Sequence, residues 1–277
     1  LIMVVQHNLQ AANTNRQLGI TTSAQAKSTE KLSSGYKINR AADDAAGLSI
    51  SEKMRSQIRG LNKASSNAQD GVSLVQTAEG ALNETHSILQ RMNELATQAA
   101  NGTNTSVDRS AIRAELDQLT SEINRIQSTT QFNTMNLLDG TFSGATNQMK
   151  LQVGALSGQS IDFSIANMCA TKIGLKTTLS VSTFTKAGSY MKSVQDAIEV
   201  VSKQRSAMGA IQNRLEHTIA NLDTTSENTQ SAESRIRDTD MASEMVTYSK
   251  NNILAQAGQS MLAQANQSNQ GVLSLLG

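Results

Sequence analysis

The stretch that decides the fold is AADDAAGLSISEKMRSQIRG, residues 41–60. Asp43 or Asp44 can cap the start of a helix, and either acid also favours the positive end of the helix dipole. From there, mostly apolar positions recur at alternating steps of four and three, which is a 3.5-residue repeat. The positions are Met54, Ile58, Leu61, Ser65, Ala68, Val72, Val75, Glu79, Leu82, His86, Leu89, Asn93 and Ala96. One helix over residues 45–100 would be roughly 80 Å long, and few globular domains contain such a rod.

The composition also favours long helices over a compact globe. Of the 277 residues, 3% are aromatic and 38% are hydrophobic, and proline and tryptophan are absent. Compact cores usually depend on aromatic side chains, whereas an absence of proline removes the residue most damaging to helices. The formal net charge of +1 provides no field that would attract nucleic acid. We therefore expect no nucleic-acid partner.

Two further helices and a small β region follow the first rod. After the turn-forming NGTNTS (101–106), a second helix antiparallel to the first is expected, with its stripe at Ile112, Leu116, Leu119, Ile123 and Ile126. MKLQV (149–153) and IDFSI (161–165) alternate as strands do, which predicts a β-hairpin. A third long helix is expected from about residue 190, with its stripe at Val194, Ile198, Val201, Arg205, Met208, Ile211, Leu215, Ile219 and Leu222. The expected fold class is mainly α, with long antiparallel helices in a coiled-coil-like bundle.

Both ends of the chain carry apolar stripes, although ordinary chain ends are polar and frayed. They are separated from the body by a break near Ser34-Gly35 and by the polar tract at 223–235. A long exposed stripe marks an interaction surface, and a contact between unlike patches of identical chains builds open helical assemblies. We therefore expect self-association through a polymerisation stripe at Val5, Leu9, Leu18, Ile253, Leu254, Met261, Val272 and Leu275.

No apolar stretch approaches the ~20 residues of a membrane span. The start, LIMVVQHNLQ, has neither the basic region nor the cleavage site of a secretory signal. We expect no membrane insertion, and either a cytosolic protein or one exported by a route that needs no cleaved signal. The single cysteine, Cys169, excludes an internal disulfide.

Several phrases, in order from end to end, resemble bacterial flagellin. They are HNLQAANTNRQLG, STEKLSSGYKINRAADDAAGLSIS, RGLNKASSNAQDGVSLVQTAEGALNE, LQRMNELATQAANGT, TQFNTMNLL, LQVGALSGQSIDF, SRIRDTDMASEM and ILAQAGQSMLAQANQSNQGVLSLLG. The departures are Leu1-Ile2 before the usual start at Met3, Asn269 where relatives often have proline, and Gly277 where they often end in arginine. These put the local helix ends in doubt, and not the family.

The resemblance implies a domain plan and a route of export. Residues 1–44 and 235–277 would pair as an inner-tube domain (D0) with its spoke. Residues 45–234 would form a rod-like domain (D1) with a β-hairpin region near 131–175. The short segment at 166–189 leaves no room for the variable outer domains of many relatives. Flagellins leave the cell unfolded by flagellar type III export, with an export chaperone on the C-terminal segment, and then fold under the filament cap. The filament cap and hook-junction proteins would be further partners.

The resemblance also implies a receptor surface. Flagellins are recognised by Toll-like receptor 5, and the matching motif is LQRMNELA (89–96), followed by a glutamate on the next helix. Carried over, the receptor contacts would be Gln90, Arg91, Leu95 and Glu115. Asn93 replaces an arginine that is common in strong agonists, so the strength of activation is open. From the bare sequence, these are also ordinary solvated helix residues.

Other classes of function have less support. His7, His86 and His217 lack metal-ligand spacing, and Cys169 has no nearby histidine in the sequence. We therefore expect no enzyme activity, no cofactor and no metal. Two non-enzymatic alternatives stay open, a hook–filament junction protein of the flagellum and a coiled-coil adhesin or scaffold.

Overall fold

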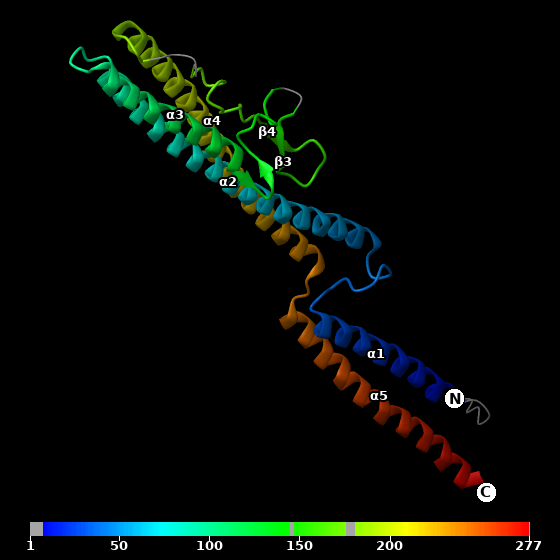
Figure 1. Ribbon diagram of the computed structural model, residues 1–277. Coiled ribbons are helices and arrows are strands. Elements are labelled where there is room, and N and C mark those ends of the chain that lie inside the picture. Colours follow the sequence, from blue (N-terminus) through cyan, green and yellow to red (C-terminus); the bar gives the residue numbers. More distant parts are fainter. Residues whose placement is uncertain (1–7, 145–146, 176–180, 277) are drawn as a thin grey trace. The chain divides into compact units, whose positions relative to one another are not determined.

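A computed structural model describes residues 8–144, 147–175 and 181–276, with side chains up to residue 268 (Figure 1). The described chain contains five α-helices and two small antiparallel sheets, so the mainly α prediction is confirmed. Its contacts divide it into two compact units. We call Leu1–Ser56 with Asn228–Gly277 the terminal unit, and Gln57–Glu227 the middle unit.

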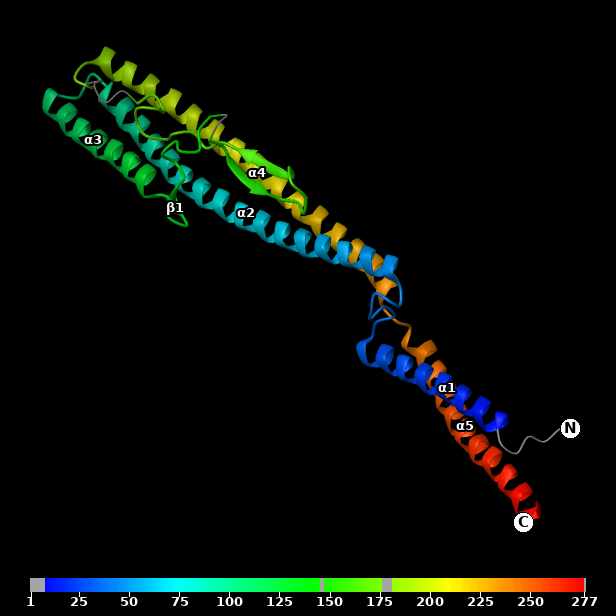
Figure 2. The same ribbon diagram turned by 90° about the vertical axis from the view of Figure 1, so that its right-hand side faces the viewer.

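The terminal unit is built on α1 (Leu9–Ser34) and α5 (Met241–Leu276) (Figures 1 and 2). The side chain of Asn8 caps α1 by accepting a hydrogen bond from the Ala11 N–H at 2.9 Å. At the other end, Gly35 has φ 75°, and its N–H donates to the carbonyl of Lys31. Glycine adopts this left-handed conformation without a Cβ penalty, which explains why the predicted break falls here.

The two aspartates of the opening stretch have different roles. Helix α2 (Ala45–Ala99) begins directly after Asp44, whose Oδ1 accepts from the Gly47 N–H at 2.9 Å. The Oδ2 of Asp43 accepts from the N–H groups of Asn39 and Arg40, so this residue shapes the preceding turn. These two backbone hydrogen bonds, with that from Arg40 the stronger, lower the pKa of Asp43. Of the two residues, Asp44 is therefore the cap.

Helix α2 buries two rows of side chains, although only one was predicted. The predicted row is buried or half-buried from Met54 to Ala96. A second row with the same 3.5-residue spacing holds mostly small or polar residues at its first positions; its members are Ala64, Asn67, Gly71, Leu74, Ala78, Ala81, Thr85, Ile88, Met92, Leu95 and Ala99. In the first row, Ser65 donates to Asp223 of the helix opposite at 2.9 Å. In the second, Asn67 donates to the Gln152 carbonyl of the β region at 3.1 Å. The rod is thus covered on two sides.

The other two long helices also follow their predicted stripes. Helix α3 (Ser106–Thr129) starts with a capping box, in which Thr105 and Asp108 bond each other's backbone N–H groups. Helix α4 (Phe184–Arg237) begins about two turns before the expected residue 190 and continues through the polar tract. Within the middle unit, bonds such as Ser65–Asp223 and Asn62–Ser226 show that α2 and α4 run antiparallel.

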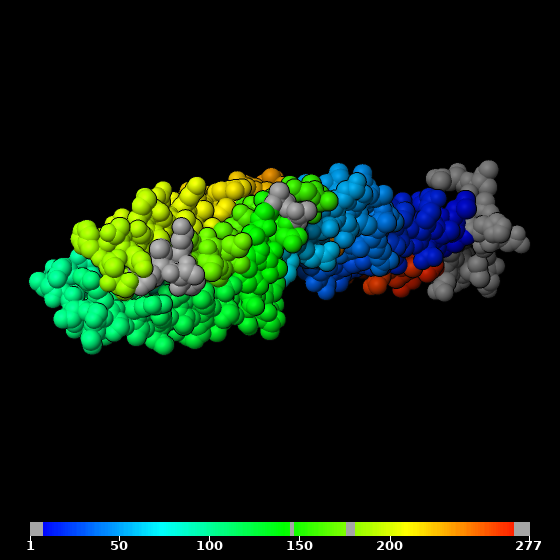
Figure 3. Space-filling model, turned by 45° about the horizontal axis from the view of Figure 1, so that its top comes forward, coloured from blue at the N-terminus to red at the C-terminus, as the bar shows by residue number. Residues whose placement is uncertain are grey.

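The predicted hairpin is confirmed as β3 (Met149–Gln152) paired with β4 (Ser160–Phe163), with Met149 opposite Phe163. A second hairpin, β1 (Gln131–Phe132) with β2 (Met135–Asn136), was not expected. Its turn uses positive φ at Asn133 and Thr134, as type I′ turns require. On the face shown in Figure 3, the green segment that carries the strands lies beside the yellow part of α4. Strand β3 lies close to α2 and to the later part of α4, since an added Cβ at Gly71 would meet Leu151 and Leu215.

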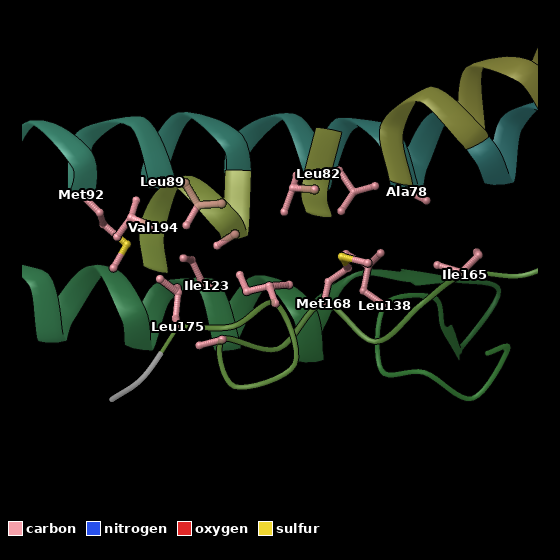
Figure 4. Close-up of a cluster of buried hydrophobic side chains, with 14 of the residues drawn as sticks. Ala78, Leu82, Leu89, Met92, Ile123, Leu138, Ile165, Met168, Leu175 and Val194 are labelled. Atoms are coloured by element: carbon pink, nitrogen blue, oxygen red, sulfur yellow. The ribbon is translucent and has the colours of Figure 1, made fainter. Parts of the chain in front are cut away.

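Most of the core of the middle unit is one large apolar cluster (Figure 4), and a small second cluster joins Leu61, Ala64 and Leu222. Met92 of α2 lies beside Val194 of α4, Leu89 points toward Ile123 of α3, and Leu82 points toward the segment below it. Side chains from the segment that follows the first hairpin close the cluster from below; they are Leu138, Ile165, Met168 and Leu175. Leu82 and Leu89 are completely buried. The apolar stripes of α2, α3 and α4 are therefore buried against one another within the middle unit.

Candidate functional site

In the terminal unit, α1 and α5 pair in antiparallel directions along their lengths. The Asn8 side chain donates to the Ala265 carbonyl at 3.1 Å, at one end of the pair. Leu18 lies against Gly258, where an added Cβ would sit 3.2 Å from the Leu18 Cδ1. At the other end, the Lys31 Nζ is 3.9 Å from Glu244.

The seam between these helices contains few large apolar side chains. On both helices, most of the buried or half-buried positions recur at steps of three and four; those that do are Ala11, Thr14, Leu18, Thr21, Gln25, Ser28 and Leu32 on α1, and Glu244, Tyr248, Asn251, Ala255, Gly258, Leu262 and Ala265 on α5. Only Leu18, Leu32 and Leu262 are aliphatic residues larger than alanine. Small residues let the two backbones approach closely, but they bury little apolar area.

Most of the large apolar side chains of α1 and α5 point outward. On these two helices, those that stay exposed are Leu9, Ile20, Met241, Met245, Val246, Ile253, Leu254 and Met261. We call these eight residues the outward apolar surface. Soluble monomers rarely expose many apolar residues together unless the surface binds something.

The residues of the predicted polymerisation stripe belong only in part to the outward apolar surface. Leu9, Ile253, Leu254 and Met261 belong to it, whereas Leu18 lies half-buried in the seam between the helices. Val5 lies outside the described residues. Val272 and Leu275 lie within the backbone of α5, but their side chains are outside the described part of the chain.

The segment that follows α1 and the segment that precedes α5 are held together by an arrangement that the sequence analysis missed. The Lys37 N–H donates to the Arg237 carbonyl at 2.7 Å, and the Thr239 N–H donates to the Gly35 carbonyl at 2.9 Å. The Arg237 guanidinium lies 4.7 Å from the centre of the Tyr36 ring. Its Nη1 also donates to Glu52 at 3.0 Å, and its side chain is only 13% exposed. We call this arrangement the linker clasp.

The residues of the predicted receptor surface lie on α2 and α3. Arg91 donates from Nε and Nη2 to one carboxylate oxygen of Glu115, at 3.1 and 3.0 Å, and from Nη1 to Glu94 at 3.3 Å. These hydrogen bonds, the one to Glu115 first, raise the pKa of Arg91. The Gln90 amide lies 3.1 Å from the Nε2 of His86. Gln90, Arg91 and Glu115 are exposed, because they lie off the buried rows of α2 and α3.

Leu95 differs from the other three residues of this set. Its side chain is 2% exposed and belongs to the apolar core, because it falls on the second buried row of α2. It supports the surface from inside and presents no side chain to a partner of the isolated subunit. Glu94, which the sequence analysis did not include, supplies the third charge of the exposed network.

The described residues hold no constellation typical of a catalytic site. Among them, no three His, Cys, Asp or Glu side chains gather closely enough to hold a metal ion. The Sγ of Cys169 lies 3.2 Å from the Thr171 hydroxyl. None of the described helices is long and apolar enough to cross a membrane.

Comparison with known proteins gives matches over both halves of the chain. The model of the bacterial flagellin N-terminal helical region matches residues 5–143, and that of the C-terminal helical region matches residues 191–276. A flagellin of Halalkalibacterium halodurans is 54% identical over 99% of this chain and 100% of its own length. The flagellin of Bacillus subtilis is 50% identical with the same coverage, and flagellin FlaB2 of Treponema pallidum is 48% identical.

Solved structures show the same architecture. The crystal structure of Bacillus cereus flagellin superposes with a TM-score of 0.50 and 31% identity, over 57% of this chain and 88% of that one. A hook-associated protein of Vibrio parahaemolyticus gives a TM-score of 0.59 over 71% of this chain and 100% of that one. At 15% identity, this second likeness concerns the fold alone.

Proposed function

Since the chain belongs to the bacterial flagellin family, we propose that it is the structural subunit of a flagellar filament and serves swimming motility. Its length of 277 residues fits a minimal form of the family. The function is mechanical. Copies pack their helices along a helical polymer, and the stiffness of that polymer transmits rotation.

The proposal depends on one observation. In the terminal unit, large apolar residues are more common on the outside of the helix pair than between the two helices. The seam between α1 and α5 has mostly small and polar residues, whereas most of the large apolar residues of these helices lie on the outward apolar surface. Burying one leucine or isoleucine contributes roughly 1.5 to 3 kcal/mol. A further copy of the chain that covers this surface therefore gains more apolar burial than α1 and α5 gain from each other.

For the domains, we propose the plan that the family resemblance implies. Residues 1–44 and 235–277 belong to an inner-tube domain (D0), and residues 45–234 form a rod-like domain (D1). The compact units divide at Ser56 and Asn228, because α2 and α4 run through both boundaries and Glu52 bonds to Arg237 within the terminal unit. The middle unit, with its complete core, suits a rod that is folded before assembly.

The test is seeded polymerisation of purified protein, followed by light scattering and electron microscopy. Leu254→Asp loses the burial of a half-exposed leucine and adds a carboxylate whose desolvation costs several kcal/mol. We expect the critical concentration to rise by about a hundredfold or more, since each 1.4 kcal/mol is tenfold. Leu254→Met is the matched control, because it keeps an apolar side chain of similar volume.

Each alternative gives a different result in this assay. A hook–filament junction protein would form short oligomers that stop growing, and a coiled-coil adhesin or scaffold would not elongate flagellar seeds. Filaments of normal length from Leu254→Asp, in a protein whose circular dichroism is unchanged, would refute assembly through the outward apolar surface.

A second proposed function is recognition of the monomer by Toll-like receptor 5 of a host. It is supported by the exposed network of Arg91, Glu94 and Glu115, with Gln90 beside it on the same helix. The guanidinium and its two carboxylates present a fixed pattern of charge on the surface. Leu95 contributes to this surface only by packing beneath it.

The other proposed partners concern export and assembly. They are a flagellar export chaperone on the C-terminal segment, and the filament cap and hook-junction proteins at the growing filament. The proposed location is the extracellular filament, reached by flagellar type III export. Binding of the chaperone to α5, measured with full-length monomer, tests the first of these.

A further inference from the structure

The methionines of the chain are unevenly distributed between core and surface. Met92, Met168 and Met208 of the middle unit are buried. Of the described methionines, four are exposed, and three of these lie on α5: Met241 is 47% exposed, Met245 51% and Met261 57%. The fourth, Met135, is 37% exposed and lies on β2 in the middle unit.

The three α5 methionines belong to the outward apolar surface. Val246 and Ile253 are seven residues apart and lie on the side of α5 away from the seam. At about 100° per residue, Met245 and Met261 fall roughly 80° to either side of Ile253. Oxidants in solution can therefore reach these sulfur atoms in a single subunit, and a covering copy of the chain would shield them.

We infer that Met241, Met245 and Met261 are modification sites for peroxide-type oxidants, and that their oxidation prevents assembly of the free subunit. This inference rests on the proposed assembly through the outward apolar surface. Methionine sulfoxide is polar, and it disrupts methionine-containing interfaces in which the thioether packs as an apolar group. A subunit oxidised before assembly would be excluded, whereas one already in a filament would be protected.

The chemistry balances with hydrogen peroxide as the oxidant. A lone pair of the thioether sulfur attacks one peroxide oxygen, and an S–O bond forms as the O–O bond breaks. Sulfur loses two electrons, and the peroxide is reduced to water after proton transfer. The sulfoxide is reversible, because methionine sulfoxide reductases reduce both of its epimers.

The experiment compares monomers with and without hydrogen peroxide treatment. Peptide mass spectrometry measures the oxidation rate at each methionine, and seeded growth measures the critical concentration. The variant Met241→Leu/Met245→Leu/Met261→Leu keeps apolar side chains of similar volume on the helix. Met135→Leu is the control for an exposed methionine outside the surface, and Met3, which lies outside the described residues, is left unchanged throughout.

We expect these three methionines to be oxidised faster than Met92 and Met208. Oxidation should raise the critical concentration of the wild-type protein and of Met135→Leu by about tenfold or more, since each 1.4 kcal/mol of lost association free energy is tenfold. The triple variant should assemble equally well before and after treatment. Treatment of the oxidised wild-type protein with the two methionine sulfoxide reductases, one for each epimer, should restore filament growth.

Two results would overturn the inference. One is a triple variant as sensitive to peroxide as the wild-type protein, and the other is equal oxidation rates at the α5 methionines and at the buried ones. If untreated wild-type protein forms no filaments at all, the proposed function itself fails, which is a distinguishable result.

Discussion

The linker clasp makes a sharp prediction, because one side chain joins both connections of the terminal unit. We expect Arg237→Ala to open the clasp while leaving the helices intact. A cation–π contact between partly exposed groups contributes about 0.5 to 1 kcal/mol, rising to about 2 when desolvated. The pair with Glu52 contributes about 0.2 to 1 kcal/mol, since Glu52 is half exposed to solvent. The combined loss is therefore ~1.5 kcal/mol, which corresponds to about tenfold in the opening equilibrium.

Amide hydrogen exchange measures this opening directly, because exchange through local opening reports its free energy. The Lys37 and Thr239 N–H groups are hydrogen-bonded across the clasp. Their exchange should accelerate about tenfold in Arg237→Ala. Tyr36→Phe keeps the aromatic face and should exchange like the wild-type protein. The Val153 N–H, bonded to the Gln159 carbonyl in the middle unit, is the internal reference. Unchanged exchange at both clasp amides in Arg237→Ala would refute this account of the clasp.

The remaining predictions concern the two units and the receptor surface. In dilute monomer, trypsin should cut α1 and α5, for example after Arg16 and Lys250, before it cuts the middle unit. The reason is that the seam between α1 and α5 buries little apolar area. Mass spectrometry that finds the first cuts in the middle unit would contradict this prediction. Hydrogen bonds from Thr105 lower the pKa of Asp108 from its usual 3.8. The stabilisation of α3 by the capping box is therefore fully present above that pH, and it is lost as pH falls through the pKa of Asp108 in the folded state. An NMR titration midpoint of Asp108 at or above 3.8 would contradict this prediction. Arg91→Glu with Glu115→Arg preserves an ion pair between α2 and α3 but reverses its polarity, so the melting temperature should hold while receptor-dependent reporter signalling by monomer is lost; full signalling would exclude these residues as contacts.

The middle unit shows how far periodicity predicts a fold. Its stripes are made of large aliphatic residues, so the spacing of Ile112 to Ile126 and of Val194 to Leu222 was enough to identify the buried faces of α3 and α4. The second row of α2 escaped detection, because several of its members are as small or polar as surface residues. Gly71 is an example, since an added Cβ there would collide with Leu151 of β3. A larger residue at this position would force the end of the Leu151 side chain to shift, and this constraint comes from a tertiary contact.

The same limitation explains why the terminal unit was predicted correctly in one respect and not in another. The apolar residues of the two chain ends are visible in the sequence. A single sequence does not show which of them pack between α1 and α5 and which stay exposed. The structure separates Leu18, which lies in the seam, from Ile253 and Leu254, which do not. It also joins Tyr36 to Arg237, two hundred and one positions apart (237 − 36), through contacts that no local pattern encodes. A helix pair that buries mostly small and polar residues while exposing isoleucine, leucine and methionine gains apolar burial when another molecule covers its outer side. That distribution, more than the length of any helix, is the physical argument that the subunit is completed by other copies of itself.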